Sequence, residues 1–121
     1  MNNLLDANAI LRYLLNDIPE QVTVVERAIK EGASTIGEAI AEVIYVLQGV
    51  YKLKRKEISD SLLVFLEEVD VLDMRIIKEA LKEYGDSSLD YVDCILYARA
   101  KILKEKVISF DKKLNKLIVQ I

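Results

Sequence analysis

Apolar residues recur every three or four positions through most of this chain, and short uninterrupted apolar runs separate the periodic stretches. A spacing of three to four residues places side chains on one face of a helix, whereas a short apolar run is typical of a buried strand. Pro19 and Gly32 stand at two of the breaks, where their backbone preferences end helices. The pattern predicts helices over residues 7–16, 20–31, 37–51, 54–69, 75–84, 89–105 and 111–117.

Five short apolar runs lie between or after these helices and predict strands over residues 2–6, 33–36, 69–72, 106–111 and 118–121. Strands that alternate with helices favour an α/β fold, because parallel strands need crossover connections that cover the faces of the sheet. We therefore predict a three-layer α/β/α architecture with a central, mainly parallel five-stranded sheet. No internal repeat or linker divides the 121 residues, so the chain is interpreted as a single domain, residues 1–121.

The chain contains no histidine and a single cysteine, Cys94. The lack of histidine excludes Ser-His-Asp and Cys-His catalysis and imidazole zinc sites, so enzyme chemistry has to rest on carboxylates and a hard metal ion. One cysteine cannot form an internal disulfide, no apolar run approaches the ~20 residues that span a membrane, and the N-terminus lacks a signal-peptide pattern. These features predict a cytoplasmic protein with no membrane partner.

Four acidic residues occupy positions where a charge is either costly or functional. Asp6 and Asp111 each follow a predicted strand, and ligands of open α/β sheets gather outside the carboxyl ends of the strands. Glu42 and Asp93 lie in the apolar helical segments AIAEVIYVL and LDYVDCILYA, which are expected to face the core, where an unpaired charge is strongly unfavourable. The four positions together predict a carboxylate cluster.

Each of these acids also has a purely structural interpretation. Asp6 and Asp111 can cap the helices that follow them, and Glu42 and Asp93 can pair with a nearby Lys or Arg. One or two Mg²⁺ ions account for all four acids together, because Mg²⁺ prefers oxygen ligands, keeps several waters and binds through few carboxylates. Glu38 shares a helix face with Glu42, and Asp90 shares one with Asp93. Both are interpreted as auxiliary acids at solvent-exposed helix positions.

Four motifs follow one another along nearly the whole chain: LLDANAILRYLL, IAEVIYVL, LDYVDCILYARA and VISFDKKL. In these motifs the sequence resembles the PIN-domain family of metal-dependent ribonucleases, and especially the compact VapC-type toxins of bacterial and archaeal toxin–antitoxin pairs. The first motif contains the Asp-x-Asn that ends the first strand of such proteins, and the last contains a Ser-x-Asp at a later strand end. The second and third supply a helical Glu and a helical Asp.

This resemblance implies a Mg²⁺- or Mn²⁺-dependent endoribonuclease. The ion would be held directly or through water by four residues, Asp6, Glu42, Asp93 and Asp111. Asn8 and Ser109 would orient water or the carboxylates instead of binding the metal. The resemblance also implies an RNA substrate, a cognate antitoxin protein and a homodimer.

Other functions remain open at this point. The chain can be an RNA-processing PIN nuclease that is not a toxin, or a non-catalytic PIN-like binding module, although all four acids are present. A phosphoacceptor receiver domain is disfavoured, because such a domain has adjacent acids after its first strand and a lysine after its last. Here Asp6 has no adjacent acid, and the sequence VISF is followed by Asp111 instead of a lysine.

The charges are unevenly distributed, although the formal net charge is only −3. Acids outnumber Lys and Arg before residue 52, and the reverse holds after residue 90. Phosphate contacts need cations beside the acidic centre. The candidates are Arg12, Lys112, Lys113 and Lys116, with Lys52, Lys54 and Arg55 as a second path; each can equally be a solvated surface residue.

Overall fold

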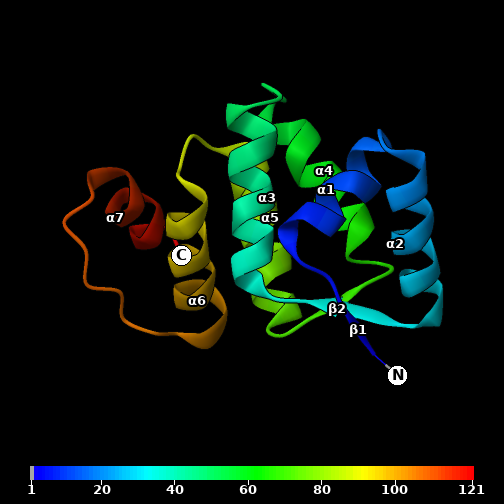
Figure 1. The fold of residues 1–121 in the computed structure, drawn as a ribbon. Coiled ribbons are helices and arrows are strands. Elements are labelled where there is room, and N and C mark those ends of the chain that lie inside the picture. Colours follow the sequence, from blue (N-terminus) through cyan, green and yellow to red (C-terminus); the bar gives the residue numbers. More distant parts are fainter. Residues whose placement is uncertain (1) are drawn as a thin grey trace.

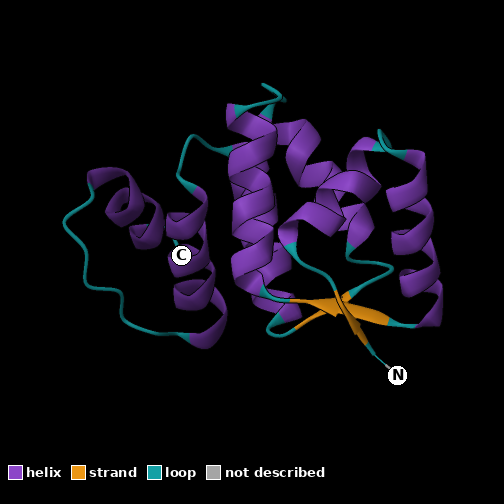
Figure 2. Ribbon diagram, in the orientation of Figure 1, coloured by secondary structure: helices purple, strands orange, loops and turns teal. Residues whose placement is uncertain are grey.

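The computed structural model describes residues 2–121, which form seven helices and three short strands (Figures 1 and 2). The strands are β1 (Asn3–Leu4), β2 (Ala33–Thr35) and β3 (Asp70–Val71). The helices are α1 (Ala7–Leu15), α2 (Pro19–Glu31), α3 (Gly37–Gly49), α4 (Arg55–Phe65), α5 (Met74–Asp86), α6 (Tyr91–Leu103) and α7 (Lys112–Val119).

Local chemistry sets several helix boundaries. Asp6 precedes α1, and its side chain accepts a hydrogen bond from the backbone N–H of Ala9 at 2.8 Å. Asp111 does the same for α7 through the N–H of Leu114, also at 2.8 Å. Pro19 is the first residue of α2, where its missing N–H has no helical partner to lose. The capping interpretation of Asp6 and Asp111 is therefore confirmed, and each carboxylate keeps a second oxygen outside its cap.

The sheet is parallel and has the order β1–β2–β3. Asn3 lies opposite Ala33, and Ser34 lies opposite Asp70. Beyond the ladder, the buried hydroxyl of Thr35 donates a hydrogen bond to the carbonyl of Leu5 at 2.8 Å. This bond fixes the carboxyl ends of β1 and β2 beside each other, directly before Asp6.

The hydrophobic core is formed mainly by side chains of helices α1, α3, α4, α5 and α6, with few from the sheet. Helix α3 contributes five buried residues to it, and α5 packs against both α4 and α6. The α4–α5 contact is close at Gly85, because a Cβ there would lie 2.8 Å from the Cβ of Ser59. At the far end of the molecule, α7 packs on α6 through Leu114, whose side chain is fully buried.

The α/β class and the parallel sheet are confirmed, but the prediction of five strands is wrong. Residues 106–111 have no regular secondary structure and lie on the side of α6 away from the sheet (Figure 1). Their apolar sequence favours a strand, but a strand forms only where a neighbour completes its backbone hydrogen bonds. No described strand lies next to them.

Residues 118–121 are not a strand either. Helix α7 continues to Val119, because Leu114, Leu117 and Ile118 keep the helical spacing and face α6. In place of the predicted five-stranded, three-layer architecture, the structure has a three-stranded sheet. The last two predicted strands are not formed by the residues to which they were assigned. None of the helices within residues 2–121 is long and apolar enough to cross a membrane.

Candidate functional site

Asp6 and Glu42 lie on one cleft, which we call the β1–α3 cleft. It has a volume of about 250 Å³ and is lined by Leu4, Leu5, Asp6, Ala7, Ile36, Glu38, Ala39 and Glu42. Thr35 and the sheet place Asp6 at this cleft, while α3 supplies the two glutamates on one face, four residues apart. Glu42 is exposed, so the expectation that it is buried in the core is wrong: its neighbours Val43 and Ile44 face the core instead.

Asp93 and Asp111 lie on a second cleft, the α6–α7 cleft. Its volume is about 470 Å³, and its walls are Ser88, Leu89, Asp90, Asp93, Phe110, Asp111, Lys112 and Lys113. Asp93 stands in the first turn of α6 and is half-buried, and Asp111 begins α7. Acids from two consecutive helices are thus brought together with two lysines.

Electrostatics within the α6–α7 cleft disfavour the ionised form of Asp93. Partial burial raises the pKa of its carboxyl above the usual 3.8, and repulsion from Asp111 and Asp90 adds to the increase. Clustered carboxylates of this kind repel one another until a cation lies between them. In the α6–α7 cleft Lys112 and Lys113 partly offset the three carboxylates, so the acids still outnumber the cations in its lining.

Tyr45 of α3 contacts a residue of the α6–α7 cleft, Asp90. Its hydroxyl lies 3.5 Å from Oδ2 of Asp90, and it stands one turn after Glu42 on the same helix. Burial, followed by the charges of Asp90 and Asp93, raises the pKa of Tyr45. The prediction from sequence did not include Tyr45, although its position three residues after Glu42 places it on the same helix face.

The four predicted acids are not gathered into one metal centre within this chain. Within residues 2–121, no group of three or more Asp, Glu or Cys is arranged to hold a metal ion. The oxygen-only donors fit Mg²⁺ or Mn²⁺ by their chemistry. Their arrangement does not complete the site, because Asp6 and Glu42 form one pair and Asp93 and Asp111 form another.

The two residues expected to orient the site have different surroundings. Ser109 accepts a hydrogen bond from the N–H of Asp111 at 3.0 Å, and Asn115 donates to the carbonyl of Ser109 at 2.8 Å. These bonds fix the turn that presents Asp111, and sequence reasoning missed Asn115. Asn8 is exposed in the first turn of α1, two residues from Asp6.

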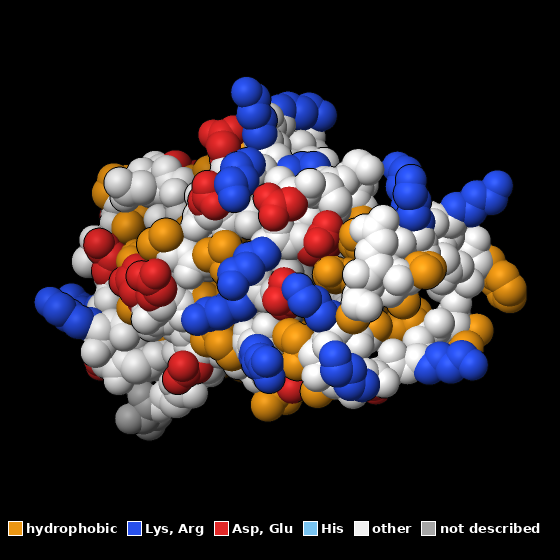
Figure 3. Space-filling view, turned by 180° about the vertical axis from the view of Figure 1, so that it is seen from behind, with side chains coloured by type: hydrophobic (Ala, Val, Ile, Leu, Met, Phe, Trp, Pro, Cys, Tyr) orange, Lys and Arg blue, Asp and Glu red, His pale blue; other side chains and the backbone are white. Residues whose placement is uncertain are grey.

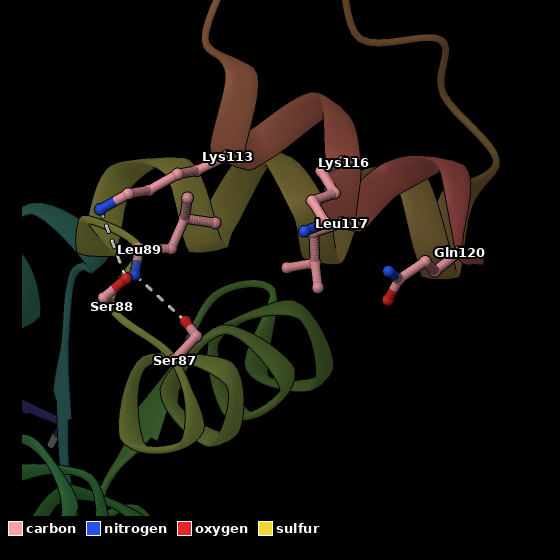
Figure 4. A pocket seen from close by; sticks show the side chains of 7 residues that line it. All are labelled: Ser87, Ser88, Leu89, Lys113, Lys116, Leu117 and Gln120. Atoms are coloured by element: carbon pink, nitrogen blue, oxygen red, sulfur yellow. Dashed lines mark hydrogen bonds between the residues drawn. The ribbon is translucent and has the colours of Figure 1, made fainter.

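The predicted cations of α7 lie beside the second pair of acids. Lys112 and Lys113 line the α6–α7 cleft, and Lys113 places its amine 3.4 Å from the hydroxyl of Ser88. An adjoining pocket of about 260 Å³ is lined by Ser87, Ser88, Leu89, Lys113, Lys116, Leu117 and Gln120 (Figure 4). Seen from behind, the end of the molecule that carries α7 shows basic and apolar side chains but few acids (Figure 3).

The two predicted arginines are held in structural contacts. Arg12 forms an ion pair with Asp17 at 3.2 Å, and its side chain is only 16% exposed. Arg55 donates hydrogen bonds to the carbonyls of Tyr84 and Leu89 and lies 3.8 Å above the Tyr84 ring. Arg55 therefore fixes the linker that leads into α6 and Asp93, a role that the sequence does not reveal.

Comparison with known proteins gives one match. The chain matches the family described as PIN domain over residues 4–118, which includes both acid pairs. Searches of curated proteins and of solved structures returned no match.

Proposed function

The chain belongs to the PIN domain family, and on this premise we propose that it is a metal-dependent endoribonuclease that hydrolyses RNA phosphodiester bonds. PIN domains are generally metal-dependent nucleases. Asp6, Glu42, Asp93 and Asp111 are the proposed site residues. The observation that carries the proposal is their placement: each lines a cleft, and a different pair of elements contributes to each cleft.

The proposed ion is Mg²⁺ or Mn²⁺, because all available ligands are oxygens. Such an ion supplies Lewis-acid activation of water and charge neutralisation at a phosphate. What the chain itself contributes is the positioning of the acids. Caps and the Ser109 turn fix Asp6 and Asp111, and the Arg55 contacts hold the start of α6 before Asp93.

We further propose that the protein is the toxin of a type II toxin–antitoxin pair and acts in the cytoplasm. The support is the resemblance of its motifs to VapC-type toxins, and the antitoxin is the partner expected with it. A small overlapping reading frame directly upstream, whose product binds this chain and suppresses its nuclease activity, is the expected finding. A nuclease whose expression leaves growth unaffected, with no such reading frame, indicates an RNA-processing enzyme instead.

Cleavage of single-stranded RNA by the purified protein tests the proposed activity. We expect cleavage with Mg²⁺ or Mn²⁺, none after addition of EDTA, and none with Asp6→Asn or Asp93→Asn. Asp60→Asn is the matched control, because Asp60 is exposed on α4 and forms only a surface ion pair, so it should cleave like the wild type. Strong cleavage that persists in EDTA rules out the mechanism. Absence of cleavage under all conditions favours the non-catalytic binding module.

A further inference from the structure

Strand β1 forms one edge of the sheet in the part of the chain that the structure describes. The N–H of Asn3 donates to the carbonyl of Gly32, directly before β2, at 2.9 Å, and the N–H of Leu5 donates to the carbonyl of Ser34 in β2 at 2.8 Å. Because these bonds alternate along a parallel ladder, the N–H and C=O of Leu4 face away from β2. Within the described chain no strand pairs with that edge, and the Leu4 side chain is 69% exposed. An open edge next to Asp6 is a template for another strand.

The same chain contains a segment that pairs with no strand in the described part of the molecule. Residues 107–110, which we call the VISF segment, connect α6 to α7 without regular structure. The side chain of Ile108 is 77% exposed and that of Phe110 is 97% exposed. Among residues 2–121, none forms a backbone–backbone hydrogen bond with this segment. Its sequence favours a strand, so it matches what the β1 edge lacks.

The VISF segment is anchored at both ends away from its own β1. Helix α6 ends just before it, and α7, which follows it, is docked on α6 through Leu114. Figure 1 shows the segment on the side of α6 opposite the sheet. Reaching β1 of the same chain would require α7 to leave α6 and expose Leu114. A second copy of the chain can reach the segment where it stands.

We infer that the VISF segment of a second copy pairs in parallel with the free edge of β1, so that the two copies complete each other's acidic site. This inference rests on the proposed nuclease function and extends it. Carboxyl ends of parallel strands meet at one edge of a sheet, so the second copy's Asp111 comes to lie beside Asp6. Asp93 shares a cleft with Asp111 and accompanies it.

Charge complementarity supports this pairing. The β1–α3 cleft carries Asp6, Glu38 and Glu42, and none of its lining residues is basic. The second copy brings Lys112 and Lys113 together with Asp111, because they are the first residues of α7. The exchange is reciprocal under two-fold symmetry, which is the commonest symmetry of soluble homo-oligomers.

Cross-linking between cysteine variants tests the pairing without reference to activity. Leu4→Cys and Ile108→Cys change two exposed side chains, and Cys94 needs no replacement, because burial raises the pKa of its thiol to about 12. Adjacent strands lie about 4.8 Å apart, within reach of a short bis-maleimide. We expect the mixed single variants to form covalent dimers. Leu72→Cys, which follows β3 at the opposite edge, replaces Leu4→Cys in the matched control and should give none.

Two outcomes overturn the inference. The first is that the mixed single variants do not cross-link above the Leu72→Cys control. The second is that the double variant Leu4→Cys/Ile108→Cys cross-links within one chain, independently of concentration, which places the segment on its own β1. Both outcomes are readable even if the wild type cleaves no RNA, so they are separate from failure of the proposed function.

Mixing inactive variants tests the shared site itself. Asp6→Asn and Asp111→Asn both retain a helix cap, because Asn caps as well as Asp. Each variant alone should be inactive. A random mixture forms hybrids with one intact site, which should restore about a quarter of the wild-type activity in a two-fold dimer. A mixture that stays inactive beside an active wild type contradicts the shared site.

Discussion

Removal of the two lysines at the start of α7 should weaken RNA binding in a salt-dependent way. Lys112 and Lys113 are exposed, line the α6–α7 cleft with Asp93 and Asp111, and form no ion pair within residues 2–121. The perturbation is the double variant Lys112→Ala/Lys113→Ala. It leaves all four acids in place, so metal binding should be nearly unchanged.

The magnitude follows from the number of phosphate contacts. Each contact to single-stranded nucleic acid contributes roughly 0.7 to the slope of log affinity against log salt, so losing two flattens the slope by about 1.4. Between about 50 mM and about 200 mM salt, the affinity ratio of wild type to variant should therefore shrink about sevenfold.

Fluorescence anisotropy of a labelled single-stranded RNA over a salt series, with a catalytically inactive background of Asp6→Asn, measures this slope. The matched control is Lys78→Ala/Lys82→Ala on α5, which removes the same charge outside the cleft. We expect the control to keep the wild-type slope. If Lys112→Ala/Lys113→Ala also keeps it, the two lysines do not contact RNA and the cations at Lys52 and Lys54 become the next candidates.

Two further changes test the geometry around Asp93. Asp93→Asn should raise the midpoint of thermal unfolding in EDTA at neutral pH. The reason is that the folded state raises the pKa of this carboxyl, so the wild type loses stability as the pH rises through that pKa. If the Asp93→Asn variant has the same midpoint as the wild type at every pH, the proposed repulsion is contradicted. Arg55→Lys loses the guanidinium contacts to Tyr84 and Leu89 and should lower the free energy of unfolding, measured in urea, by about 2 kcal/mol. The control Arg75→Lys changes an exposed residue and should alter this free energy by less than about 0.5 kcal/mol. Equal effects of the two substitutions exclude the anchoring role of Arg55.

The first two thirds of the fold follow closely from the sequence. Helices α1 to α5 lie where the apolar spacing predicts them, because each has a buried stripe, and the breaks at Pro19 and Gly32 are local. The strands β1 to β3 were also predicted, since each lies in a short run directly before a helix. The local apolar spacing is sufficient to predict an element when the elements that pack against it are specified by the same spacing.

The C-terminal part could not be predicted in the same way. Whether residues 106–111 form a strand depends on a partner for their backbone, and no local pattern specifies where that partner lies. Residues 118–121 read as a strand by composition, yet Leu114 and Leu117 set a helical period that continues through Val119. Tertiary contact decided both segments.

The candidate site was predicted by residue but not by arrangement. The motifs identified Asp6 and Asp111 at element boundaries, and the structure adds that both cap helices. Sequence could not reveal that Tyr45 joins α3 to Asp90, because that contact depends on how α3 and α6 pack. It also could not show that the acids form two separate pairs within one chain.

Binding of Mn²⁺ followed by electron paramagnetic resonance tests most directly whether the two acid pairs form one site. Glu42→Gln alters the β1–α3 cleft and Asp93→Asn alters the α6–α7 cleft, while Glu31→Gln at the end of α2 is the control. If the pairs act as one site, either cleft substitution alone abolishes the tight binding seen in the wild type and in Glu31→Gln. If each cleft variant instead retains wild-type Mn²⁺ binding, the four acids do not form a common metal centre.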